Sequence, residues 1–370
     1  MNVVETEVGV EAPVGMAPSG ASGSGKEPRP ILEVNDLRVT FSRAGAPPLH
    51  AVNGLSYSVR SGRTLAIIGE SGSGKSVSVR ALMGLLPPSA FVTGSATLSD
   101  TELIGMNEKA LRQIRGNDIA MVFQDPARSL NPTMSVGKQI GEAVRMHLQI
   151  GRKEVAERAV ELLKLVRLPA AEHRYHEYPH QLSGGMRQRV MIAIALAANP
   201  KLLIADEATT ALDVTTQAQI MELLVDLQER LGTAVIMISH DLALAASYAD
   251  DVLVMYAGKI VERADTKTLF RHVRHPYTKA LLEAIPQLGV PSHTSLKTIA
   301  GEPPDLSALP VGCAFRARCP RAVDICAIKE PPLDEHEPGH RFACWNPHPA
   351  SGDKDTGIPI DIRTRDEDLS

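Results

Sequence analysis

The sequence predicts an α/β fold with a parallel sheet at its core. Short apolar runs of the kind that form buried parallel strands alternate along the chain with segments of helical periodicity. A glycine-rich turn joins one such run to one such helix, and another run ends in two carboxylates. This alternation is typical of strand–helix–strand units that share one parallel sheet.

The expected strands occur in both halves of the chain. The first two flank a loop rich in glycine and proline, and the shorter ones that follow are mostly apolar. We expect strands at 31–41, 49–59, 64–69, 118–124, 201–206 and 233–239. A further hairpin is expected at 252–261, with its turn at Ala257–Gly258.

The expected helices are identified by apolar residues that recur every three or four positions. One helix at 75–86 follows the glycine-rich turn, and helical segments are expected within 266–286. In a helix at 152–168 the apolar positions are Val155, Ala159, Leu162 and Val166. In a helix between the last two parallel strands they are Ile220, Leu223, Leu227 and Leu231.

Composition limits the class of protein. The 370 residues include 39 Lys and Arg and 43 Asp and Glu, which gives a net charge of −4. A mildly acidic chain lacks the basic surface of a dedicated nucleic-acid-binding protein. The longest apolar run, Val190–Ala198, is far shorter than the ~18 residues of a membrane-spanning helix. The N-terminal residues, which include Glu5 and Glu11, lack a signal-peptide pattern, so we expect a soluble cytosolic chain.

A phosphate-binding loop is the clearest motif of the sequence. The segment Gly69-Glu70-Ser71-Gly72-Ser73-Gly74-Lys75-Ser76 matches the pattern GxxxxGK[ST] at every position. It lies between an expected strand and an expected helix, and in such a loop backbone N–H groups and the helix N-terminus surround phosphate oxygens. Lys75 is expected to reach the β- and γ-phosphates, and Ser76 to bind Mg²⁺.

Two carboxylates complete this expected site. Asp206 and Glu207 end an apolar strand, and a buried parallel strand ends at the carboxyl edge of its sheet, beside the phosphate-binding loop. Asp206 would hold Mg²⁺ through water, and Glu207 would act as general base on the attacking water. Without the loop, the same pattern would indicate a strand that ends in solvated acids.

A second glycine-containing element precedes an apolar helix. It reads Leu182-Ser183-Gly184-Gly185-Met186-Arg187-Gln188-Arg189. At a helix N-terminus, Ser183, Gly184 and Gly185 would form a second anion site. One nucleotide does not need two such sites from one chain, whereas in a dimer each chain could offer this element to the γ-phosphate that its partner holds. The sequence therefore predicts a dimer.

At these residues the sequence resembles the ABC ATPases, whose signature is LSGGxxQR. The resemblance implies a RecA-like parallel sheet, an antiparallel β subdomain and a helical subdomain. It also implies roles for three further residues. Gln124 matches the glutamine that senses Mg²⁺ and the membrane subunit, Asp213 in Ala211-Leu212-Asp213 matches the D-loop, and His240 matches the switch histidine that contacts the γ-phosphate.

An aromatic residue that stacks on adenine is expected upstream of the phosphate-binding loop, where Phe41 is the nearest candidate. Stacking on an aromatic ring needs no particular neighbours, so the sequence pattern tests it weakly. The same residue would suit a core position equally well.

Finer motifs resemble the ATPases of oligopeptide and dipeptide importers, a branch that includes nickel systems. They are Gln124–Pro126 with Ser129–Pro132, Tyr178–Gln181, Thr209–Thr215 and His275–Thr278. The resemblance extends from residue 31 to residue 347 and departs at Ala208, where the family usually has proline; no catalytic group is lost there.

The resemblance also implies partners and a location. Two membrane permease subunits would dock on the helical region 127–180, and a paralogous ATPase would complete a heterodimer. A substrate-binding protein would deliver peptide without touching this chain. The chain would then lie peripherally on the cytoplasmic face of the cell membrane, and no nucleic acid is expected as a partner.

The expected domain layout follows from composition and resemblance. An ABC ATPase domain would span 31–286, and a C-terminal extension of the peptide-importer type would span 287–350. Residues 1–30 are rich in Gly, Pro and Ser, so a disordered leader is expected there. The charged residues 351–370 are expected to form a flexible tail.

All four cysteines fall within 32 residues of the expected extension: Cys313, Cys319, Cys326 and Cys344. A reducing cytosol disfavours disulfides, and the short C-x2–4-C knuckles of a structural zinc site are absent. Irregular, wider spacings with a neighbouring proline favour an iron–sulfur cluster, while zinc and unmetallated cysteines stay open. The resembling peptide-importer ATPases carry such a motif, and this implies a [4Fe–4S] cluster.

The function predicted from these features is an ATP-binding and ATP-hydrolysing subunit that powers a peptide importer. The alternative is a soluble ABC ATPase of nucleic-acid repair or ribosome function. Such chains tend to carry long coiled-coil insertions or a second cassette, whereas 107 residues separate Lys75 from Ser183 here. A regulatory protein with a vestigial ATPase is disfavoured by the intact Asp206, Glu207 and His240.

Overall fold

The fold is described from a computed structural model of the chain. The structure describes residues 29–209, 212–285 and 298–349. The leader and the tail expected at the two ends of the chain lie almost wholly outside the described residues. Within the described ranges, no helix combines the length and the apolar character that crossing a bilayer requires.

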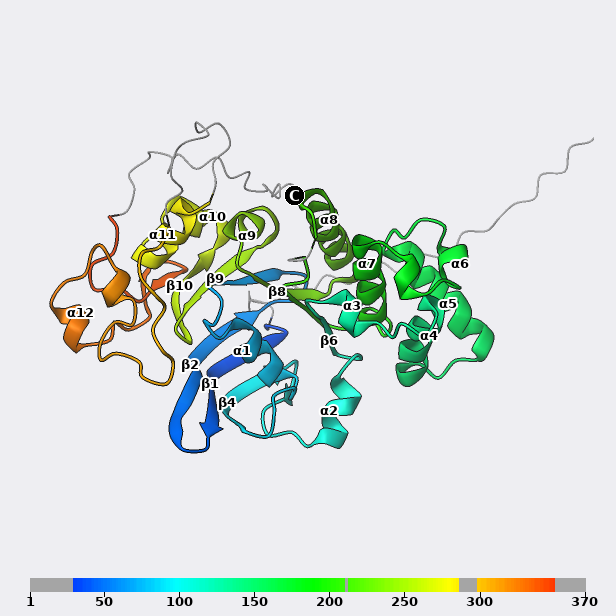
Figure 1. Cartoon of the computed structure of the whole chain (residues 1–370), viewed down its shortest axis with the longest axis horizontal. Coiled ribbons are helices and arrows are strands. Elements are labelled where there is room, and N and C mark those ends of the chain that lie inside the picture. Colours follow the sequence, from blue (N-terminus) through cyan, green and yellow to red (C-terminus); the bar gives the residue numbers. More distant parts are fainter. Residues whose placement is uncertain (1–28, 210–211, 286–297, 350–370) are drawn as a thin grey trace, which may run out of the picture.

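An eight-stranded sheet forms the centre of the molecule (Figure 1). Five neighbouring strands of this sheet run parallel: β9 (Asp251–Tyr256), β3 (Thr64–Ile68), β8 (Ala234–Ser239), β7 (Leu202–Asp206) and β6 (Ile119–Val122). Every residue of β3, β7 and β8 is buried, which explains why these segments are almost continuously apolar. The predicted α/β fold with a parallel sheet is confirmed.

Three antiparallel strands extend this sheet beyond β9: β10 (Lys259–Asp265), β12 (His340–Phe342) and β11 (Asp334–Glu337). The predicted hairpin is formed by β9 and β10. Because β12 pairs with β10, part of the C-terminal extension continues the core sheet, and a separate C-terminal module is not confirmed. The pairing satisfies backbone groups that the outer edge of β10 would otherwise expose.

A second, antiparallel sheet lies next to the first. It consists of β2 (Ala46–Val59), β1 (Leu32–Arg43), β4 (Ala90–Leu98) and β5 (Thr101–Glu102), in that order. Its buried face shares one hydrophobic cluster with β3 and with α1 (Lys75–Leu82), through residues such as Val34, Ile67 and Val79. This cluster joins the two sheets and α1, and Figure 1 shows α1 lying next to the antiparallel sheet.

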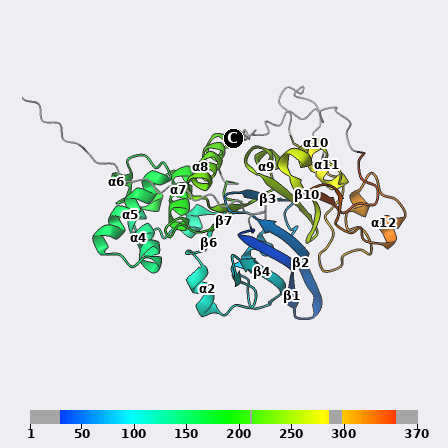
Figure 2. The same cartoon turned by 180° about the vertical axis from the view of Figure 1, so that it is seen from behind.

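Helices cover the rest of the central sheet. In both views α4 to α7 group beside β6, while α9 to α11 lie over β9 and β10 (Figure 2). One large hydrophobic cluster joins them to the sheet and includes the fully buried Ile140, Leu162 and Ile192. The helices are α2 (Glu108–Ile114), α3 (Pro126–Ser129), α4 (Val136–His147), α5 (Arg152–Leu165), α6 (Ala171–Arg174), α7 (Gly184–Ala195), α8 (Val214–Leu231), α9 (Leu242–Tyr248), α10 (Thr266–Arg271), α11 (Pro276–Glu283) and α12 (Ile325–Ile328).

Three details of the predicted helices are wrong. The helix predicted at 75–86 ends at Leu82, because Gly84 adopts a left-handed φ of +58°. The helix predicted at 152–168 ends at Leu165, two residues before Arg167 takes a φ of +56°. Leu231 is the last residue of α8, and its exposed fraction is 37%, so it does not share the buried face of that helix.

A buried carboxylate connects β10 to the C-terminal strands. Glu262 is fully buried, and its Oε1 accepts hydrogen bonds from the Arg274 N–H at 2.7 Å and from His340 Nε2 at 2.9 Å. Its Oε2 accepts one from the His275 N–H at 3.1 Å. A buried carboxylate is tolerated only with such partners, so Glu262 ties β12 and the start of α11 to the sheet.

His275 caps α11 in the same region. Its side chain is 1% exposed, and its Nδ1 accepts a hydrogen bond from the Tyr277 N–H at 3.1 Å. Burial lowers the pKa of His275 to about 4, because the charged imidazolium would lose its hydration. The neutral form is therefore the one that the fold selects.

We expect His275 to make the fold sensitive to acid. Between the unfolded pKa of 6.5 and the folded pKa of about 4, the unfolded chain binds a proton at this residue that the folded chain does not. This residue alone should lower the free energy of unfolding by roughly 2 kcal/mol from pH 7 to pH 5. His275→Asn keeps a capping side chain without titrating. We measure the free energy of unfolding of both proteins by urea denaturation at pH 7 and pH 5. It should fall by roughly 2 kcal/mol more for the unmodified chain than for His275→Asn. An equal fall in the two proteins would contradict the prediction.

Candidate functional site

Four neighbouring strands bring the predicted site residues to one edge of the central sheet. In the order β3, β8, β7, β6, the residues that follow or end these strands are Gly69, His240, Asp206 with Glu207, and Gln124. The strands are parallel and in register, since Ile68 pairs with Ser239 and Asp206 with Ile238. Their carboxyl ends therefore converge, as expected for ligand sites of open α/β sheets.

The phosphate-binding loop is packed against backbone on two sides. A Cβ on Gly69 would lie 2.2 Å from the carbonyl oxygen of Met255 in β9, and one on Gly74 would lie 2.3 Å from that of Ala51 in β2. Gly74 also has a left-handed φ of +99° at the N-terminus of α1. Only glycine fits at these two positions.

Lys75 lies inside the loop and is 4% exposed. Its Nζ donates hydrogen bonds to the carbonyl oxygens of Gly69 at 2.7 Å and Glu70 at 2.9 Å, and lies 3.4 Å from the Ser73 hydroxyl. Burial lowers the pKa of Lys75, and the charge of Glu207 opposes this shift. Ser71 and Gly72 are exposed at the tip of the loop, so the tip is accessible to a ligand.

Asp206 and Ser76 are brought together as the sequence predicts. The Ser76 hydroxyl donates to Asp206 Oδ1 at 2.6 Å, and Asp206 is 2% exposed. The other carboxylate oxygen pairs with Arg80 Nη2 at 3.1 Å. A hydroxyl beside a carboxylate suits Mg²⁺, which prefers oxygen ligands.

Glu207 and Gln124 also meet. Gln124 Nε2 donates a hydrogen bond to Glu207 Oε2 at 2.9 Å. Glu207 has a left-handed φ of +48°, and its backbone N–H bonds to the carbonyl oxygen of Ile238 at 3.1 Å. A non-glycine residue adopts this conformation uncommonly, because its Cβ approaches the backbone closely there. His240 directly follows β8 and is exposed at the same edge.

The second predicted anion element begins α7. Ser183 is its N-cap, whose hydroxyl accepts a hydrogen bond from the Met186 N–H at 3.3 Å, and Gly184 is exposed. Gly185 packs on the first turn of α8, where a Cβ would lie 2.5 Å from Thr216.

Asp213 begins α8 next to this element. Its carboxylate accepts one hydrogen bond from the Thr216 N–H at 3.0 Å and another from the Thr216 hydroxyl at 2.7 Å. These two hydrogen bonds lower the pKa of Asp213. Ala211 of the same motif lies outside the described residues. In Figure 1, α7 lies among the helices beside β6, whereas α1 lies beside the antiparallel sheet, so the two anion elements occupy different parts of the chain.

Phe41 lies in β1 and is half-buried against the hydrophobic cluster that joins the two sheets. Its partners across the strands are Leu49 and Ala90. A role in stacking on adenine stays a prediction.

The four cysteines lie in one neighbourhood. The Cys313 N–H bonds to the carbonyl oxygen of Cys326 at 2.9 Å, and Cys326 is buried. Burial raises the pKa of Cys344 to about 12, and the charges of Cys319, Cys313 and Cys326 add to this. Among the described residues, however, no group of three or more His, Cys, Asp or Glu side chains is arranged to hold a metal ion. The predicted iron–sulfur or zinc site therefore has no support from this geometry.

Three residues that sequence reasoning missed contact the site: Arg80, Tyr277 and Arg318. Arg80 could have been found, because it lies four residues after Ser76 and thus on the same face of α1. Tyr277 appears in the sequence only as part of a family motif, and nothing in the sequence pattern marks Arg318.

Comparisons with known proteins show which families and structures the chain resembles. Residues 52–210 match the family model described as ABC transporter, and residues 261–326 match the model described as oligopeptide/dipeptide transporter, C-terminal region. An oligopeptide transport ATP-binding protein of Escherichia coli K12 is 50% identical over 86% of this chain and 93% of its own length. Its counterpart in Bacillus subtilis 168 is 49% identical over 86% of this chain and 89% of its own length.

A solved structure with a similar fold is a dimeric ATP-binding cassette in a post-hydrolysis state, bound to ADP and Pi. It is 28% identical, with a TM-score of 0.57, and it covers 64% of this chain and 98% of its own. A transporter cassette from Clostridium perfringens is 30% identical with a TM-score of 0.56, over 65% of this chain and 90% of its own.

The contact between Ser76 and Asp206 predicts how the site depends on Mg²⁺. Ser76→Ala removes the hydroxyl, so the Mg²⁺ concentration for half-maximal ATP hydrolysis should rise by about ten-fold or more. Ser76→Thr keeps a hydroxyl at the same atom and serves as the matched control. A Mg²⁺ titration in which the alanine and threonine variants coincide with the unmodified chain would refute this role.

Proposed function

The chain belongs to the ABC transporter ATPases, in their oligopeptide branch, and we propose that it binds and hydrolyses ATP to drive the import of peptides through a membrane. The observation that carries this proposal is the meeting of Lys75, Ser76, Asp206, Glu207 and Gln124 at one sheet edge. The oligopeptide transport ATP-binding proteins that this chain resembles over most of its length support peptides as the cargo class.

The phosphate-binding loop would hold the triphosphate. The tip residues Ser71 and Gly72 are exposed, while Ser73, Gly74 and Lys75 line the buried base of the loop. Backbone N–H groups at the N-terminus of α1 and the ammonium of Lys75 together offer fixed positive charge to phosphate oxygens. Catalysis of phosphoryl transfer depends mainly on such positioning and charge stabilisation.

A bound Mg²⁺ would neutralise part of the negative charge that develops during phosphoryl transfer. Ser76 and Asp206 are the residues that would hold it, together with Gln124 when that side chain turns from Glu207. Arg80 pairs with the same carboxylate and compensates its charge. Arg80 is 43% exposed, so this pair is screened by solvent and can open when the ion enters.

Glu207 is proposed as the general base. It is half-buried, its backbone N–H donates a hydrogen bond to the Ile238 carbonyl oxygen, and its carboxylate accepts a hydrogen bond from the Gln124 side-chain N–H. A carboxylate oriented in this way can take the proton of a water that attacks the γ-phosphate. His240, exposed after the neighbouring strand, is proposed to contact the γ-phosphate.

A second ATPase subunit is proposed to complete the site. Ser183 and Gly184 are exposed at the N-terminus of α7, and Asp213 begins α8 beside them. Val214 next to them is 83% exposed, which suits a surface that another subunit covers. We propose a nucleotide-sandwich dimer in which the partner is a paralogous ATPase.

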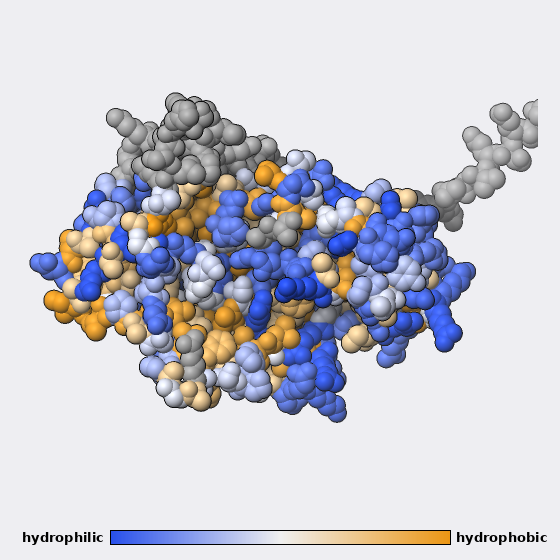
Figure 3. All heavy atoms as spheres, viewed as in Figure 1, coloured by the Kyte–Doolittle hydropathy of each residue, from blue (hydrophilic) through white to orange (hydrophobic). Residues whose placement is uncertain are grey.

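Two membrane permease subunits are proposed to dock on the helical region 127–180. An open groove there is lined by Pro132, His173, His176, Glu177, Tyr178, His180 and Gln181. Figure 3 shows mainly hydrophilic residues over α4 to α6 on the face it presents. Attachment to the membrane through protein contacts, on its cytoplasmic face, fits such a surface better than insertion into lipid. A substrate-binding protein would act on the permease subunits and not on this chain.

A [4Fe–4S] cluster on the four cysteines is the remaining part of the proposal. What supports it is the sequence pattern: all four cysteines of the chain fall within 32 residues, and three of them lie in the stretch that matches the peptide-transporter C-terminal region. The side chains are not arranged around a common centre, so no catalytic step is assigned to such a group. The expected role of the cluster is to stabilise the fold of the C-terminal extension, a segment with few strands and helices.

Glu207→Gln tests the general base. The variant should bind ATP as the unmodified chain does and lose hydrolysis by about 10²-fold or more, since an amide cannot accept the proton. Glu222→Gln, on the exposed face of α8, is the control and should keep full turnover. The measurement is phosphate release by the assembled transporter. Undiminished release from Glu207→Gln would sink the assignment.

Anaerobic purification tests the cysteine site. Iron and acid-labile sulfide should each approach four per chain, with the brown absorbance of a cluster, and Cys344→Ser should lower both. Stoichiometric zinc without iron would identify the alternative metal instead, and protein free of both metals would show that the cysteines are unmetallated.

A further inference from the structure

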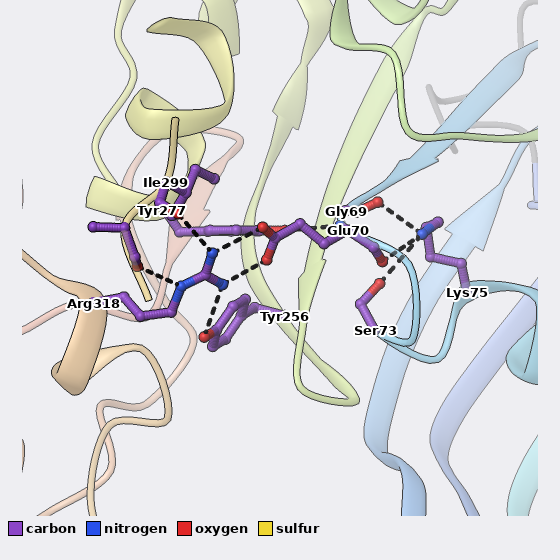
Figure 4. A network of polar contacts seen from close by, with 9 residues as sticks. Gly69, Glu70, Ser73, Lys75, Tyr256, Tyr277, Ile299 and Arg318 are labelled. Carbon is purple, nitrogen blue, oxygen red and sulfur yellow. Dashed lines mark hydrogen bonds and ion pairs between the residues drawn. The ribbon is translucent and has the colours of Figure 1, made fainter. Parts of the chain in front are cut away.

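An arginine from the C-terminal extension contacts the phosphate-binding loop (Figure 4). Arg318 Nη1 lies 2.6 Å from Glu70 Oε2, and its Nη2 lies 2.9 Å from Glu70 Oε1. The two residues are 248 positions apart in the sequence, and the Arg318 side chain is only 4% exposed. A bidentate arginine–carboxylate pair removed from solvent is among the strongest polar contacts of a protein.

The guanidinium is held in place from other directions as well. Its Nε donates to the carbonyl oxygen of Ala300 at 3.0 Å, and Nη2 lies 3.4 Å from that of Ile299. The group also lies over the rings of Tyr256 and Phe315, at 5.9 and 6.0 Å from their centres. These contacts fix the plane of the Arg318 guanidinium in one orientation. A lysine ammonium has no such plane and could not make the same set of contacts.

Glu70 is fixed at three points. Its N–H donates to the Tyr277 hydroxyl at 2.9 Å, its carbonyl oxygen accepts from Lys75 Nζ at 2.9 Å, and its carboxylate pairs with Arg318. Figure 4 shows that the carboxylate points to Arg318 while the carbonyl points to Lys75 on the opposite side. One residue thus links the C-terminal extension to the lysine of the loop.

The loop touches the extension at a second place. Pro303, Pro304 and Leu306 line a small cavity together with loop residues 70–73. The Leu306 carbonyl oxygen also accepts a hydrogen bond from the His50 N–H at 3.3 Å. The extension therefore lies against the outer side of the loop and not only against Glu70.

We propose that Arg318 is a positioning residue for the phosphate-binding loop and that it sets how tightly the loop holds the phosphates of a nucleotide. The proposal rests on the nucleotide binding proposed above. Arg318 does so in two ways. It keeps the Glu70 backbone where its carbonyl orients Lys75, and it neutralises a carboxylate that would otherwise repel an anionic ligand at the loop.

The test compares nucleotide binding by the full-length chain with that of three variants. Arg318→Met keeps the apolar stem but removes the charge, and it should raise the Kd and the KM for ATP about ten-fold with kcat nearly unchanged. The loss should be larger for ATP than for AMP, since it grows with phosphate charge. Arg318→Met with Glu70→Gln removes both charges and should recover part of the affinity. Arg318→Lys should fall between the unmodified chain and Arg318→Met.

Arg321→Met is the matched control. Arg321 lies three residues further along the same segment, but its guanidinium bonds to Asn346 and Pro347 within the extension. The Arg321→Met variant should therefore bind ATP with unchanged affinity. The proposal is wrong if Arg321→Met weakens ATP binding as much as Arg318→Met does. It is also wrong if Arg318→Met weakens the binding of ATP and of AMP by the same factor, since either result would indicate a general effect on folding.

Two further outcomes separate this inference from the proposed function. If Arg318→Met fails to fold, Arg318→Lys decides: a raised KM at an unchanged melting temperature supports the proposal, and an unchanged KM overturns it. An unmodified chain that binds no ATP would refute the function itself. An unmodified chain that binds ATP, with Arg318→Met binding it equally well, would refute only the role of Arg318.

Discussion

The position of β3 between β8 and β9 is the constraint on which the site depends. Because both edges of β3 are paired, its carboxyl end can turn only into the narrow space between the backbones of β2 and β9. The glycines at 69 and 74 are required by this packing, whatever ligand the loop binds. The pairing of β3 with β8 places His240 at the next strand end, and the pairing of β8 with β7 places Asp206 at the one after it, so one sheet orders the whole site.

The parts of this site that could be predicted are those that depend on strand direction. Gln124, Asp206 and Glu207 each come after or at the end of an apolar run, and parallel strands bring such ends together. The hydrogen bonds from Ser76 to Asp206 and from Gln124 to Glu207 follow from that arrangement. The partners of Ser183 and Asp213 across a dimer could be predicted only from resemblance, because a single chain does not contain them.

The parts that could not be predicted depend on contacts between distant segments. Nothing local marks Arg318, because its partner is defined only once the extension packs on the loop. The strand β11 has the sequence Asp-Glu-His-Glu, which carries no apolar alternation, and it forms because β12 pairs with β10. Its charges then occupy the outer edge of the sheet, where they discourage pairing with other chains.

The separation of 248 positions between Glu70 and Arg318 has a consequence for biosynthesis. At ribosomal rates of about 5–20 residues per second, the first nucleotide motif emerges roughly 10 to 50 seconds before the arginine that clamps it. During that interval the nascent ATPase core lacks the contact between Arg318 and Glu70. The emergence of Arg318, and not that of the loop itself, therefore marks the time at which the loop can acquire its full set of contacts.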